Sequence, residues 1–147
     1  MRCEICPRRC NAERTAEKVG GVCRMPAGLV VARAMLHLWE EPVLSGKNGA
    51  GCIFFSGCNM GCVFCQNMDI SQSAKGVVKD AGELADIMLR LQELGSNNIN
   101  LVTPAPHVRM IAKAVPLARM RGLRIPIVYN LSLIHISEPH ETRGNLV

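Results

Sequence analysis

The pattern of apolar and polar positions predicts strands alternating with helices over residues 51–130. Short apolar runs bounded by glycine or proline are typical of strands, and apolar residues recurring every three or four positions are typical of helices. Asp80 and Glu83 form a capping-box pattern at the start of the first helix. In chain order, the expected elements are a strand at 52–56, a helix at 81–94, a strand at 98–103, a helix at 108–121 and a strand at 125–130. This alternation predicts an α/β fold with parallel strands joined by right-handed crossovers.

The chain of 147 residues has about the length of one domain, and we divide it into four segments. Residues 1–24 are rich in cysteine, 25–50 hold one expected strand and a linker, 51–130 form the alternating core, and 131–147 are a tail that does not continue the core pattern. The longest apolar run is interrupted by Arg33 and is too short to span a bilayer. The first residues lack the apolar stretch of a secretory signal. We therefore expect a soluble, cytoplasmic protein without a membrane partner.

Four of the eight cysteines are grouped in the first segment with the spacing C-x2-C-x3-C-x12-C. They are Cys3, Cys6, Cys10 and Cys23. Without an export signal, cysteines at such spacing favour metal binding in a reducing cytoplasm over disulfide bonds. Four thiolates can complete a tetrahedral zinc site or an iron–sulfur cluster, and the spacing leaves both alternatives open.

Three further cysteines, Cys58, Cys62 and Cys65, follow the first core strand with the spacing C-x3-C-x2-C. Loops that leave the carboxyl ends of parallel strands carry the chemistry of many α/β proteins. Three thiolates can hold three irons of a [4Fe–4S] cluster and leave the fourth iron open, whereas a closed structural cluster takes four cysteines. The eighth cysteine, Cys52, lies inside the expected strand and is interpreted as a small core residue.

The net charge of +5 is mild, and many of the cationic residues lie among the first cysteines. A basic patch can attract nucleic acid. However, aromatic residues make up only 3% of the chain, so platforms for base stacking are scarce. We therefore interpret the cations as partners of thiolates and a cluster, and we expect no nucleic acid partner.

The three-cysteine loop, with Phe64 directly before its last cysteine, resembles the signature of the radical S-adenosylmethionine (radical SAM) superfamily. The wider context within residues 54–72 is similar to the branch related to pyruvate formate-lyase activating enzymes. Further stretches resemble little-characterised members of that branch, namely C-E-I-C-P-R-R-C at 3–10, L-W-E-E-P at 38–42 and N-I-N-L-V-T-P at 98–104.

The resemblance implies the N-terminal part of a partial (β/α) barrel, preceded by the small cysteine-rich segment. It implies that Cys58, Cys62 and Cys65 ligate a [4Fe–4S] cluster and that Phe64 lies near the adenine of S-adenosylmethionine bound to the open iron. Reductive cleavage of that cofactor would give a 5′-deoxyadenosyl radical that abstracts hydrogen from a substrate. The implied partners are an electron donor of flavodoxin or ferredoxin type and, if the protein activates a glycyl-radical enzyme, a protein substrate.

One segment departs from the wider superfamily pattern. Many members carry Gly-Gly-Glu at the end of the second core strand to hold the amino group of the cofactor, and this chain has Thr103-Pro104 there. The branch it resembles also tends to have Thr-Pro at this place. The alternative function is a non-catalytic module in which both cysteine sets bind iron–sulfur clusters or zinc.

The tail at residues 131–147 is interpreted as a non-native sequence. Its first residues, L-S-L-I-H-I-S-E-P, match the translation of a transposon-end adapter used in sequencing libraries. We exclude the tail from the fold. On this interpretation about half of the barrel is missing, and we expect the chain to be inactive as an enzyme on its own.

Overall fold

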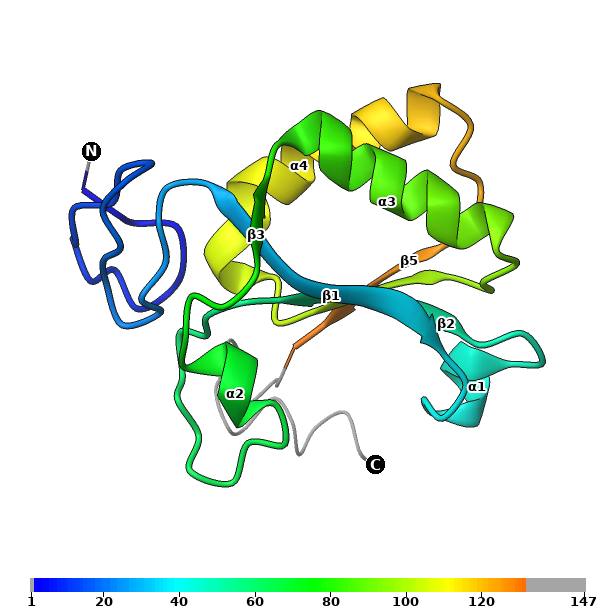
Figure 1. The fold of residues 1–147 in the computed structure, drawn as a ribbon, viewed down its shortest axis with the longest axis horizontal. Helices are drawn as coiled ribbons and strands as arrows, with labels where there is room; N and C mark the ends of the chain where they lie inside the picture. Colours follow the sequence, from blue (N-terminus) through cyan, green and yellow to red (C-terminus); the bar gives the residue numbers. More distant parts are fainter. Residues whose placement is uncertain (1, 132–147) are drawn as a thin grey trace.

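The computed structural model describes residues 2–131, in which a five-stranded open sheet organises an α/β fold (Figure 1). The strand order across the sheet is β3-β1-β2-β4-β5. The strands are β1 (Leu29–His37), β2 (Ala50–Phe55), β3 (Val77–Lys79), β4 (Ile99–Val102) and β5 (Ile127–Asn130). The helices are α1 (Pro42–Ser45), α2 (Met68–Ser71), α3 (Ala81–Glu93), the 3-10 helix η1 (Ala105–His107) and α4 (Val108–Met120).

The parallel core predicted from the sequence is confirmed. Strand β2 pairs in parallel with β4, and β4 pairs in parallel with β5, so that Ile53, Leu101 and Tyr129 lie side by side. Strand β1 runs antiparallel to both β2 and β3. The strand β3 and the short helices were not predicted, because three or four residues are too few to establish a periodic pattern.

Helices α3 and α4 lie on the same side of the sheet and bury its apolar face (Figure 1). Alternate residues of β2, Ile53 and Phe55, point into this core together with Leu84 of α3 and Ile111 of α4. Because side chains alternate along a strand, Cys52 belongs to the opposite face of the sheet. No helix within residues 2–131 is long and apolar enough to cross a membrane.

Helix α3 begins where its sequence predicts and ends within one residue of the predicted position. The Asp80 side chain accepts a hydrogen bond from the Glu83 backbone N–H, and the Glu83 carboxylate accepts one from the Asp80 N–H, each at 2.8 Å. Gly95, directly after the C-cap residue Leu94, has a φ of 88°, a left-handed conformation that glycine adopts without strain. These two ends fix the length of α3 and therefore the position at which β4 begins.

A buried histidine joins η1 to the end of β2. His107 is 2% exposed, and its Nε2–H donates to the backbone oxygen of Ser56 at 2.8 Å. Its ring lies against Phe55, with 5.4 Å between the ring centroids. Burial, together with the nearby charge of Arg14, lowers the pKa of His107 to about 4, so the ring is neutral near pH 7. The contact holds the start of α4 beside the loop that carries Cys58.

Acidification is expected to destabilise the fold through His107. Between the usual pKa of 6.5 and the folded value of about 4, the unfolded chain binds a proton that the folded chain does not. The free energy of unfolding should therefore fall by up to about 3 kcal/mol between pH 7 and pH 4. Urea unfolding across this pH range should show a flatter profile for His107→Gln than for the wild type. Identical slopes for the two proteins would contradict this role of His107.

Candidate functional site

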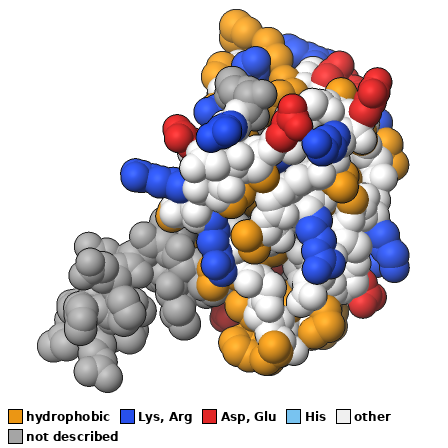
Figure 2. Space-filling model, turned by 90° about the vertical axis from the view of Figure 1, so that its left-hand side faces the viewer, with side chains coloured by type: hydrophobic (Ala, Val, Ile, Leu, Met, Phe, Trp, Pro, Cys, Tyr) orange, Lys and Arg blue, Asp and Glu red, His pale blue; other side chains and the backbone are white. Residues whose placement is uncertain are grey.

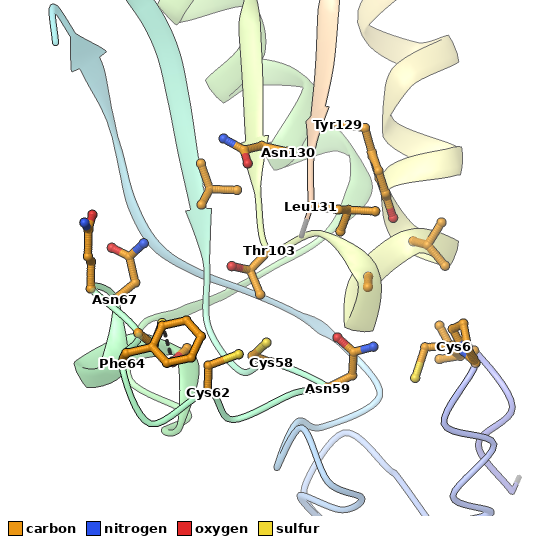
Figure 3. A pocket seen from close by; sticks show the side chains of 18 residues that line it. Cys6, Cys58, Asn59, Cys62, Phe64, Asn67, Thr103, Tyr129, Asn130 and Leu131 are labelled. Carbon is orange, nitrogen blue, oxygen red and sulfur yellow. Dashed lines mark hydrogen bonds between the residues drawn. The ribbon is translucent and has the colours of Figure 1, made fainter. Parts of the chain in front are cut away.

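A cavity of about 610 Å³ opens at the carboxyl ends of the parallel strands (Figure 3). Val102 and Thr103 line it from the end of β4, and Tyr129 and Asn130 line it from the end of β5. The loop after β2 supplies a further wall. This edge of an open α/β sheet is where such folds place ligands, and it agrees with the location predicted for the three-cysteine loop.

Cys58, Cys62 and Cys65 all line this cavity and are partly exposed. The backbone N–H of Met60 donates to Cys58 Sγ at 3.4 Å, and the hydroxyl of Ser71 donates to Cys65 Sγ at 3.5 Å. The loop therefore places the three sulfurs predicted from the sequence at one cavity, where they are candidate ligands.

The described side chains do not form a ready site for a single metal ion. Within residues 2–131, no three His, Cys, Asp or Glu side chains are gathered closely enough to bind one ion. An iron–sulfur cube binds each cysteine at a different iron, so its ligands do not need to converge on one point. The volume of the cavity that the three thiols line is within the range of small-molecule pockets.

The opposite wall contains a strained residue that the sequence did not predict. Thr103 has a φ of 60°, a left-handed conformation that is unfavourable for a β-branched residue. Its backbone N–H donates to the oxygen of Asn130 at 3.3 Å. Such strain is concentrated at ligand sites, where the surrounding structure holds it in place. Pro104 does not predict this conformation, because the residue before a proline is usually extended, with a negative φ.

Phe64 is 83% exposed and lines the same cavity. In Figure 3 its ring lies beside Cys62 at the mouth of the cavity. An exposed aromatic face at a cavity offers a stacking surface for a flat ligand. This geometry is compatible with the expected place of Phe64 beside an adenine ring.

The N-terminal segment also contributes to this cavity. Cys6 lines it from the side opposite Phe64, as Figure 3 shows. The Arg8 guanidinium donates from Nε to the backbone oxygen of Asn59 at 2.8 Å. The sequence analysis treats the two cysteine sets as separate. In the structure, Cys6 of the first set lines the same cavity as the three cysteines of the second set.

Two of the remaining cysteines of the first set lie beside Gly21. A Cβ atom at Gly21 would lie 3.0 Å from the sulfur of Cys10 and 3.9 Å from the sulfur of Cys23. Burial acts to raise the pKa of the Cys3 thiol, but the Ile5 backbone and the Arg14 guanidinium, 3.5 Å from the sulfur, together hold that pKa below its usual value. Burial raises the pKa of Cys23. Cys3 therefore loses its proton more readily than Cys23.

Cys52 lies outside both sets, as the sequence indicates. It is fully buried in β2, and its thiol donates to a carboxylate oxygen of Glu40 at 3.4 Å. Burial and this carboxylate raise the pKa of Cys52 to about 12. A cysteine that stays protonated in this way is a poor metal ligand.

Gly57 permits the close contact between the N-terminal segment and the loop. A Cβ atom at this position would lie 2.5 Å from the backbone oxygen of Cys23 and 2.5 Å from Cγ of Met25. Gly57 and Gly61 share a φ of 74°, but nothing lies within 4 Å of a Cβ at Gly61. Comparing the same substitution at the two glycines therefore separates the cost of the backbone conformation from the cost of the packing contact.

Comparison with known proteins adds a relationship but no activity. The uncharacterized protein MJ0674 of Methanocaldococcus jannaschii is similar, with 34% identity over 140 residues. The match covers 89% of this chain and 38% of that protein, so the chain spans well under half the length of this relative. No family model and no solved structure matches the chain.

Alanine at Gly57 should destabilise the protein more than alanine at Gly61. Both substitutions impose a left-handed conformation that costs an alanine about 1–2 kcal/mol. Gly57→Ala should cost a further ~1–3 kcal/mol, because the added methyl group overlaps the backbone of Cys23. Urea unfolding under reducing conditions measures both losses. Equal losses for the two variants would show that the contact between the segment and the loop is not tightly packed.

Proposed function

We propose that the chain is part of a radical SAM iron–sulfur protein in which Cys58, Cys62 and Cys65 hold a [4Fe–4S] cluster. The observation that carries the proposal is that these three cysteines line one cavity at the carboxyl ends of parallel strands. A three-cysteine set leaves one iron for a cofactor. The open α/β sheet is compatible with the N-terminal part of a partial (β/α) barrel, in which β2, β4 and β5 are the first three parallel strands.

The chemistry that such a cluster and S-adenosylmethionine supply is one-electron reductive cleavage of the sulfonium C–S bond, which releases methionine and a 5′-deoxyadenosyl radical that takes a hydrogen atom from the substrate. The residues of the chain position and tune these groups. The hydrogen bonds from Met60 N–H and the Ser71 hydroxyl would reduce the negative charge on the Cys58 and Cys65 sulfurs and so would favour the reduced state of a bound cluster. Phe64 offers its ring to the adenine, and Thr103 and Asn130 offer polar groups at the far wall.

The proposal includes a second metal site and defined partners. The thiols of Cys3, Cys6, Cys10 and Cys23 would bind zinc or a second iron–sulfur cluster. Cysteines at metal-ligand spacing suit a reducing cytoplasm, which keeps thiols available for metals. An electron donor of flavodoxin or ferredoxin type would supply the electron, and an activating role would add a glycyl-radical enzyme as the protein substrate.

Electron paramagnetic resonance tests the proposal. After anaerobic reconstitution with iron and sulfide and reduction with dithionite, addition of S-adenosylmethionine should change the spectrum, because only a cluster with an open iron can bind it. Cys65→Ala should abolish the change, and the matched control Cys52→Ala should retain it. The measurement is repeated on a double variant, Cys10→Ala with Cys23→Ala. This variant removes any spectrum that comes from a cluster bound by the first cysteine set. An unchanged spectrum with the cluster shown to be present would favour the non-catalytic binding module.

The chain alone should bind the cluster but not sustain turnover. Strand β5 is an edge strand within residues 2–131, so one side of the cavity depends on what lies beside it. Where that side is open, water would have access to the cavity and a bound cofactor would be held less firmly. Chromatographic assay should detect no more than background 5′-deoxyadenosine from the reconstituted chain. Release of several equivalents per cluster would contradict this expectation.

A further inference from the structure

A second cavity, of about 640 Å³, lies between the N-terminal segment and the first turns of α4. It shares only Ile5 with the cavity at the strand ends. Cys3 and Arg14 line it from the segment, and Arg109 and Lys113 line it from α4. It is therefore a separate site from the one that holds the three-cysteine loop.

The cavity is strongly cationic. Arg2, Arg14, Arg109 and Lys113 line it, and no Asp or Glu does. Within the described part of the chain, none of these four side chains forms an ion pair with a carboxylate. Figure 2 shows Lys and Arg side chains spread over the face of the molecule on which the N-terminal segment lies.

Two of these cations are placed unfavourably for the protein alone. Arg109 and Lys113 are four residues apart on α4, so their like charges are neighbours on the helix surface, which destabilises a helix by a few tenths of a kcal/mol. No acidic residue lines the cavity beside them to offset the repulsion. A bound anion would convert this repulsion into attraction to a shared partner.

Arg14 supplies a buried charge without a carboxylate partner. It is 6% exposed, and its guanidinium donates to the backbone oxygens of Pro26 at 3.0 Å and Pro106 at 3.4 Å. These neutral oxygens fix the side chain, and the Cys3 sulfur, 3.5 Å from the guanidinium, would offset part of its charge as a thiolate. An anion in the adjoining cavity would offset the remainder and stabilise the arrangement.

His107 adds a specific acceptor. Its Nε2–H is used by Ser56, so in the neutral ring Nδ1 carries a lone pair. This buried atom lacks a hydrogen bond of good geometry, although the Gly28 backbone lies near the ring. A ligand with an O–H group beside its negative charge would satisfy Nδ1. Ile5, Ala27, Met110 and Ala112 give the rest of the cavity an apolar lining.

We propose that this cavity binds a phosphate monoester with an apolar substituent. The phosphate lies against the cations, its protonated oxygen donates to Nδ1 of His107, and the substituent occupies the apolar part. A phosphate monoester supplies between one and two negative charges near pH 6 together with an O–H donor. A carboxylate supplies one charge and no donor.

Isothermal titration calorimetry of the full chain at pH 6 and low salt tests the proposal with three matched probes. Phenyl phosphate should bind, benzoate should bind at least tenfold more weakly, and phenol should not bind detectably. Added salt should weaken the binding of phenyl phosphate, because the exposed cations are screened. Equal affinity for benzoate and phenyl phosphate, or no binding of phenyl phosphate, would overturn the proposal.

Two variants locate the binding site. Arg109→Gln combined with Lys113→Gln should lower the affinity for phenyl phosphate at least tenfold, and the control Arg124→Gln, an exposed arginine outside the cavity, should change it less than twofold. Ala112→Phe should block the cavity without changing its charge, and the control Ala74→Phe adds the same group at an exposed position elsewhere. Unfolding curves confirm that each variant is folded. Unchanged affinity in both cavity variants would place the ligand elsewhere and overturn the proposal.

Discussion

The parallel pairing of β2 with β4 is the constraint on which the rest of the molecule depends. It aligns Ile53 with Leu101 and thereby brings the ends of both strands to one edge of the sheet. Parallel pairing requires a crossover, and α3, fixed at both of its ends, supplies one of the required length. Two walls of the cavity at the strand ends follow from this arrangement, because the loop after β2 and the turn after β4 emerge side by side.

The parts of this arrangement that the sequence predicts are those encoded within about fifteen residues. The apolar spacing of α3, its Asp80 cap, the alternating strands and the cysteine spacing are local signals, and the structure confirms the helix and the strands. The left-handed conformation of Thr103 is not local, since it depends on the backbone of Asn130 in the neighbouring strand. The antiparallel partner of β2 was also beyond local pattern, because a single strand does not determine the direction of its neighbour.

The second cavity was even harder to predict from local sequence patterns than the conformation of Thr103. Arg14 and Pro106 are 92 positions apart in the chain and meet only in the folded protein. Nothing in the neighbourhood of Arg14 in the sequence separates it from the other arginines of the first segment. Its distinction is burial against Cys3 and two backbone oxygens, at the wall of a cavity that no Asp or Glu lines. Function at this site is therefore encoded in the tertiary structure rather than in a motif.

The contacts between the N-terminal segment and the three-cysteine loop have a consequence for ligand binding. Arg8 reaches the backbone oxygen of Asn59 at the start of the loop, and Arg24 reaches that of Gln72 after α2. The segment therefore spans the loop from end to end. By thermodynamic linkage, any ligand that orders the segment lowers the entropy lost when the loop binds its own ligand, and the reverse holds by the same factor. Under the proposed function, occupancy of either cysteine set would therefore favour ligand binding at the other.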